Sequence, residues 1–112
     1  NVFPLTSPGG QALTSLAGGA PQGATMVGIR PEALHVSREG PSGDVMLVEA
    51  LGAESLLHLR MGEDRLILRG GADNRVTEGQ TLHLGADRDG VTFFDAGERA
   101  MDRGGPALKV VE

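Results

Sequence analysis

The stretch from Asp44 to Leu68 constrains the fold more strongly than any other part of this sequence. It contains three short apolar runs, which are separated by polar or glycine-bearing breaks at Gly52-Ala53 and Gly62-Glu63-Asp64. Each run is too short for a stable helix and has the usual length of a β-strand. Both breaks have the composition of turns. The stretch therefore predicts a three-stranded antiparallel meander around which a small β-domain can be built.

The side chains of the second apolar run divide between two faces. Because successive residues of a strand point to opposite sides, Leu57, Leu59 and Met61 are expected on one face. Leu56, His58 and Arg60 are expected on the other face. Since the meander carries apolar residues on both faces, one face can line the interior and the other must be covered. The amino-terminal hairpin, a neighbouring domain and a second copy of the chain are the candidate covers.

The composition indicates one small domain and limits the partners that it can have. The chain has 112 residues with 18 glycines, 6 prolines and 3% aromatic residues, which favours turns and short strands over a helical bundle. Fifteen acidic residues against ten basic ones give a formal net charge of −5, which argues against a nucleic-acid surface. The absence of cysteine excludes disulfides and thiolate metal sites and fits a cytosolic protein.

The amino-terminal part is expected to form short strands and turns. Val2–Leu5 and Gln11–Leu16 are interpreted as two strands, with a turn at Ser7–Gly10 between them. Ala24–Ile29 is predicted as a further strand. The residue before a proline is held extended, so the chain should turn after this strand. Pro31–Leu34 is expected to form one helical or 3₁₀ turn with proline in its first position.

Turn signals and apolar runs predict the remaining elements. Arg38–Gly43 has the composition of a turn that precedes the meander. Thr81–Leu84 and Val91–Phe94 are predicted strands, and Asp89-Gly90 between them is a hairpin signal. We place the domain in residues 1–99. Residues 100–112 are expected to be a flexible tail that can add a short strand near its end.

The sequence does not assemble a catalytic, cofactor or metal site. Its glycine pairs lack the lysine-bearing phosphate-loop pattern and are interpreted as turns. His35, His58 and His83 have no ligand spacing, so half-exposed positions on strands are favoured, although a catalytic dyad stays open. Glu49 and Glu54 flank a turn. Paired carboxylates can act as acid and base, but loop capping or interface ion pairs are the favoured interpretation here.

Several short motifs follow one another along the chain. They are Gly28-Ile29-Arg30-Pro31-Glu32, Val48–Ser55, Thr77-Glu78-Gly79-Gln80, Phe94–Arg99 and an Asn1-Val2-Phe3 entry. In this order they resemble the carboxy-terminal region of ATP-binding subunits of bacterial ABC importers of the maltose and glycerol-phosphate type. The last motif departs from the family in being shorter between Asp95 and Gly97. The resemblance runs from about Asn1 to Arg99.

This resemblance implies a transport-associated OB-type domain, the TOBE module. The expected fold is all-β, a small OB-like barrel or sandwich of short antiparallel strands. The resemblance implies no catalytic, cofactor-binding or metal-binding residue in this domain. Its candidate motif and interface residues are Gly28, Arg30, Pro31, Glu32, Glu49, Gly52, Glu54, Leu56 and His58. Arg30 and Glu32 can equally form an ion pair that fixes the turn at Pro31.

The resemblance also implies a function and partners. We expect a non-catalytic regulatory or interaction domain of an importer for sugars or related solutes, cytoplasmic and peripheral to the inner membrane. Its partners would be the parent ATPase domain, the transmembrane permease subunits and a second copy that contacts Leu56 or His58. The domain itself would hold no cofactor, since ATP and magnesium would bind the parent's ATPase domain. A module that binds small oxyanions is the alternative, and a nucleic-acid binder is opposed by the net charge.

Overall fold

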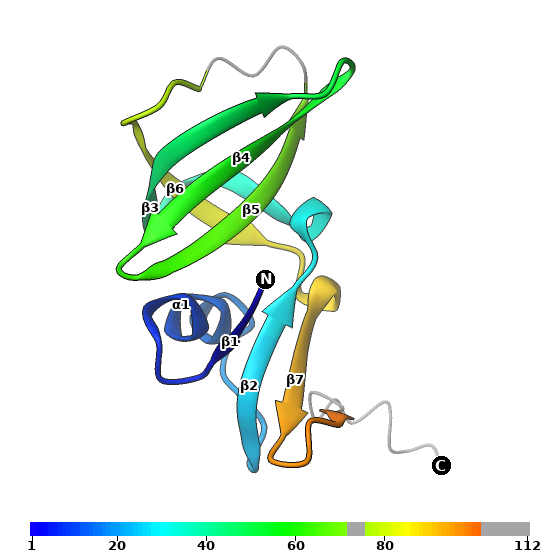
Figure 1. Ribbon diagram of the computed structural model, residues 1–112. Helices are drawn as coiled ribbons and strands as arrows, with labels where there is room; N and C mark the ends of the chain where they lie inside the picture. The colour runs from blue at the N-terminus through cyan, green and yellow to red at the C-terminus, as the bar shows by residue number, and fades with distance from the viewer. Residues whose placement is uncertain (72–75, 102–112) are drawn as a thin grey trace.

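The computed structural model describes residues 1–71 and 76–101, and most of these residues lie in two four-stranded antiparallel sheets (Figure 1). The first sheet has the order β1-β2-β7-β8, with β1 at Val2–Pro4, β2 at Ala24–Ile29, β7 at Val91–Asp95 and β8 at Ala100–Met101. The second has the order β5-β4-β3-β6, with β5 at Asp64–Gly71, β4 at Glu54–Met61, β3 at Leu34–Ala50 and β6 at Thr81–Ala86. The predicted all-β class is confirmed, and the described strands form a sandwich of two sheets without closing into a barrel.

The predicted meander forms three of the four strands of the second sheet. β3 pairs with β4 and β4 pairs with β5, both antiparallel, and Leu57 lies opposite Val48 on one side and Leu68 on the other. Leu57 and Leu59 are both 0% exposed, whereas Leu56 is only partly buried. The predicted division of this strand into an inward and an outward face is therefore confirmed.

One cluster of buried side chains joins the two sheets and the helix α1 at Pro8–Leu16. Its largest fully buried members are Phe93, Leu13, Leu34, Leu57, Leu59, Leu66, Leu68, Leu84 and Val27. Figure 1 shows α1 beside β1, next to the turn between β4 and β5. Because the helix contributes Leu13 to the same cluster, the two sheets and the helix share one core.

The strand predicted at Gln11–Leu16 is wrong, because this segment belongs to α1. Ser7 caps the helix by accepting a hydrogen bond at Oγ from Gly10 N at 3.1 Å, and Pro8 occupies the first turn. The Asp64 carboxylate accepts a second hydrogen bond from Gly9 N at 2.7 Å. A carboxylate is favourable at a helix amino terminus, so the distant β4–β5 turn helps to fix this helix.

The turn predicted at Arg38–Gly43 is also wrong, because β3 runs through it as a bulge. Ser37 and Ser42 both lie opposite His83, so the residues between them have no partners of their own in β6. Gly40 adopts a φ of 118°, and its carbonyl oxygen lies 2.9 Å from His83 Nδ1. A bulge of this kind accommodates glycine and proline without ending the strand.

The hairpin predicted at Asp89-Gly90 is wrong as well. β6 pairs with β3 in the second sheet, whereas β7 pairs with β2 in the first. Between them, Arg88–Gly90 forms the 3₁₀ turn η2, which carries the chain from one sheet to the other. The 3₁₀ turn expected after Pro31 is confirmed as η1 at Pro31–Ala33, and it packs against β5 and η2.

The first sheet continues past the expected end of the domain at residue 99. In β8, Ala100 lies opposite Phe94 and Met101 lies opposite Phe93. The further strand expected near residues 108–111 lies outside the described residues. The boundary between a domain at 1–99 and a flexible tail at 100–112 stays a prediction.

Candidate functional site

The candidate residues from the sequence fall into two places in the fold. Glu49, Gly52, Glu54, Leu56 and His58 lie on β3, on β4 and on the turn between them. The other four candidates, residues 28, 30, 31 and 32, lie where β2 leaves the first sheet and enters η1. The structure therefore gives two candidate surfaces, one on the second sheet and one at the crossing between the sheets.

The first surface is the outward face of β3, β4 and β5, opposite the core. Its central row consists of Leu47, His58 and Ile67, which lie directly opposite one another across the three strands. Leu47 is 45% exposed, and Leu56 and Ile67 are partly buried. His58 Nε2 lies 3.1 Å from Glu49 Oε1. This row is an apolar strip with one histidine at its centre.

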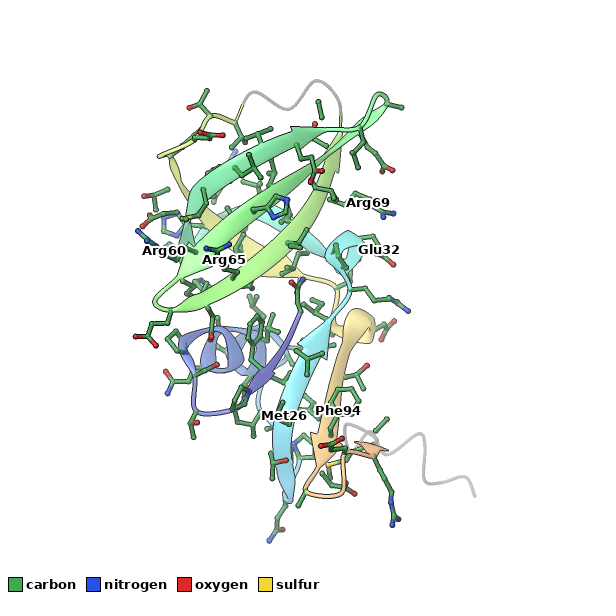
Figure 2. The ribbon with its side chains drawn as sticks, in the orientation of Figure 1. Met26, Glu32, Arg60, Arg65, Arg69 and Phe94 are labelled. Atoms are coloured by element: carbon green, nitrogen blue, oxygen red, sulfur yellow. The ribbon has the colours of Figure 1, made fainter. Side chains whose placement is uncertain are left out.

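Charged side chains lie at both ends of this outward face, on either side of the strip along the strand direction. At one end Asp44, Arg60 and Arg65 are cross-strand neighbours. At the other end are Glu49, Glu54 and Arg69, and Arg69 Nε lies 3.6 Å from Glu54 Oε1. Figure 2 shows Arg60 and Arg65 together and Arg69 apart from them. One end thus carries two arginines and one acid, and the other carries two acids and one arginine.

The turn between β3 and β4 ends this surface with an exposed tip. Gly52 has a φ of 85° and adopts the left-handed conformation, which favours glycine. Leu51 N donates a hydrogen bond to Glu54 O at 2.8 Å, and the Leu51 side chain is 48% exposed. The tip therefore adds an apolar side chain to the acidic end of the surface.

The second surface surrounds the Arg30-Pro31-Glu32 turn. Arg30 Nε lies 3.4 Å from Glu32 Oε2, and the side chains are 70% and 51% exposed. The pair connects neighbours within one turn and does not reach a strand of either sheet. Gly28 is buried, and a Cβ at this position would lie 2.9 Å from Val2 Cγ2 and 3.0 Å from Asn1 O. Gly28 thus lets β1 pass close to β2.

Arg30→Ala is expected to change the free energy of unfolding by less than about 0.5 kcal/mol, because an exposed ion pair contributes little. Urea denaturation of the wild type and the variant measures this change. Glu32→Ala is the matched control and should give an equally small effect. A loss above about 1 kcal/mol in Arg30→Ala alone would show that the guanidinium contributes to stability in a way that its exposure does not explain.

Asn1 connects the two sheets, a role that the motif containing it did not predict. Its side-chain Oδ1 accepts a hydrogen bond from Ile67 N at 2.8 Å, and its Nδ2 donates one to Ile67 O at 2.9 Å. Its backbone oxygen accepts a hydrogen bond from Ile29 N at 2.9 Å. Asn1 therefore ties the first sheet to the edge strand β5 of the second, across a sequence separation that no local pattern reveals.

The first of these surfaces has the chemistry of a protein contact. Apolar side chains bordered by exposed charges of both signs can pack against a partner and fix its orientation. In residues 1–71 and 76–101 no group of three or more histidine, aspartate or glutamate side chains is placed to hold a metal ion. The same residues include no helix with the length and apolar character needed to cross a membrane.

Comparison with known proteins gives one family and a set of similar sequences. The family model of the TOBE domain matches residues 27–94, from β2 to β7. The sn-glycerol-3-phosphate import ATP-binding protein of Escherichia coli strain K12 is 38% identical over 72 residues, which cover 62% of this chain and 20% of that protein. The protein of the same name from Shigella sonnei strain Ss046 is 36% identical over 72 residues, with the same two coverages. The chain thus spans about a fifth of the length of these relatives.

Proposed function

We propose that this chain, which belongs to the TOBE domain family, is a non-catalytic interaction and regulatory domain of the ATP-binding subunit of a bacterial ABC importer. The match to the family over residues 27–94 carries this proposal. The relatives named as glycerol-3-phosphate import ATP-binding proteins favour a phosphorylated polyol, a sugar or a related solute as the cargo of the parent. In this proposal the parent's ATPase domain holds ATP and magnesium, and the subunit lies at the cytoplasmic side of the inner membrane beside its permease subunits.

The outward face of β3, β4 and β5 is the proposed contact with a second copy of the chain. Its apolar strip needs a cover, and its two ends carry charge of opposite net sign. A two-fold axis near His58 that lies in the interface and exchanges the two ends of the face would place the arginine-bearing end of each copy near the acidic end of the other. Such a self-complementary arrangement is what a two-fold interface requires.

The proposal predicts that the chain alone does not bind ATP. The described loops include no strand-to-helix phosphate loop, and the helix amino terminus at Gly9 is already occupied by the Asp64 carboxylate. Titration calorimetry with magnesium-ATP should give no heat of binding. The matched control is the parent subunit, which should bind the nucleotide under the same conditions. Micromolar binding of ATP to the isolated chain would contradict a non-catalytic role.

A further inference from the structure

The outward face of the first sheet is a second apolar surface, separate from the proposed contact between copies. Met26 and Phe94 lie directly opposite each other on β2 and β7, and Figure 2 shows their side chains on this part of the sheet. Val2 on β1 lies opposite Gly28 and is 55% exposed. Three apolar side chains from three strands therefore share one face that is not packed in the core.

Two hollows follow this face and meet at Val2 and Phe94, which line both. The first has a volume of about 310 Å³ and extends past Gly28 to Arg30. The second has a volume of about 350 Å³ and extends past Met26 to Glu98. Pockets of about 300 to 1,000 Å³ are the usual size for binding sites. Together the hollows form a groove, which we call the β1–β2–β7 groove, with an apolar middle and charged ends.

Glu98 is held at its end of the groove by a short turn. Its φ is 64°, the only positive φ of a non-glycine residue in the described part of the chain. Asp95 Oδ1 fixes the turn by accepting hydrogen bonds from Gly97 N at 2.9 Å and from Arg99 N at 3.0 Å. Glu98 N donates to Asp95 O at 2.8 Å. The left-handed residue is a normal feature of a short hairpin turn, and here the turn between β7 and β8 fixes the backbone from which the Glu98 side chain extends.

The charges around the groove favour a basic occupant. Glu98 places a carboxylate at one end, while the guanidinium at the other end, that of Arg30, already lies beside Glu32. The whole chain carries a net charge of −5, which attracts basic partners and repels anionic membrane surfaces and nucleic acids. We propose that the β1–β2–β7 groove binds an extended segment of a partner protein, in which apolar side chains pack on Val2, Met26 and Phe94 and a lysine or arginine pairs with Glu98.

A designed peptide tests this proposal directly on the full chain. The probe is a dye-labelled peptide, Lys-Thr-Leu-Thr-Val-Thr-Leu-Thr-Lys with blocked ends, whose lysine and apolar side chains all lie on one face of the extended chain. Its partner probe carries glutamate in place of both lysines. Fluorescence anisotropy should show saturable binding of the basic peptide and binding of the acidic peptide at least about fivefold weaker, the factor that one charge pair of about 1 kcal/mol provides. Amide NMR shifts should move at Met26 and Phe94 and not on β4.

Charge reversal separates a specific pair from general attraction. Glu98→Lys should weaken the basic peptide about fivefold and strengthen the acidic one. Glu39→Lys is the matched control, because it makes the same change of charge at an exposed position in the bulge of β3, and it should alter either affinity less than about twofold. Glu98→Gly should also weaken the basic peptide but should not lower the melting temperature, because glycine accepts the positive φ.

Three results would overturn the proposal. The first is absence of saturable binding of the basic peptide to the wild-type chain. The second is that Glu98→Lys and Glu39→Lys weaken binding of the basic peptide equally, which would show that only the net charge of the chain attracts the peptide. The third is self-association of the chain that Phe94→Ser abolishes, which would assign the β1–β2–β7 groove to a second copy.

Discussion

Leu57→Ala is expected to lower the free energy of unfolding by about 3 kcal/mol or more. The Leu57 side chain is 0% exposed at the centre of the second sheet, between Val48 and Leu68 on the neighbouring strands. Truncation removes the transfer energy of the buried methyl groups and leaves a cavity that a β-sheet cannot easily close. Urea denaturation at several temperatures measures the loss.

The neighbouring residue is the matched control for this variant. Leu56→Ala removes the same atoms from the opposite face of β4, where the side chain is only partly buried. It should cost about 1 kcal/mol or less. Equal losses for Leu56→Ala and Leu57→Ala would contradict the assignment of the two faces of β4, and with it the interpretation of the outward face as a contact surface.

Gly10→Ala is expected to cost about 3 kcal/mol, although alanine favours a helix more than glycine does. A Cβ at Gly10 would overlap the carbonyl oxygen of Pro4 and would lie 2.8 Å from the Pro4 carbonyl carbon and 3.0 Å from Leu5 Cα. All three are backbone atoms, so no side chain can rotate away. Helix α1 would have to move away from β1, and the core residue Leu13 of the helix would be drawn out of its packing. Thermal denaturation followed by circular dichroism measures the loss.

A second glycine separates this clash from the general cost of replacing glycine. Gly52→Ala meets no atom within 4 Å, but it forces alanine into a φ of 85°. It should cost about 1 to 2 kcal/mol from backbone strain alone. A Gly10→Ala variant as stable as the wild type would contradict the close packing of α1 on β1.

The meander was predictable because its information is local. Alternation over Leu56–Met61 and the turn residues on both sides specify strand, face and pairing within one short stretch. The helix was not predicted, since Gly9 and Gly10 look like turn residues in sequence. Their helical conformation depends on Ser7 and on Asp64, whose carboxylate comes from a turn far along the chain. Local helix propensity is a weak predictor where a tertiary contact of this kind determines the backbone conformation.

Local sequence patterns also could not predict the path of the chain between the two sheets. Asp89-Gly90 is a typical hairpin sequence, yet β6 and β7 do not pair with each other. Instead β6 pairs with β3, and β7 pairs with β2. Among the candidate site residues, alternation along the strand placed Leu56 and His58 on one face together with Arg60. It did not reveal the charge pattern around them, because Asp44 and Arg65 join Arg60 only through strand register.

Light scattering over a range of concentrations tests most directly the claim that the outward face of β3, β4 and β5 is an association surface. The wild-type chain should shift from monomer toward dimer as concentration rises. Leu56→Asp should remain folded and monomeric, while Ala20→Asp, which adds the same charge in an exposed loop, should dimerise as the wild type does. A wild-type chain that stays monomeric up to millimolar concentration, or a Leu56→Asp variant that dimerises equally well, would contradict the account.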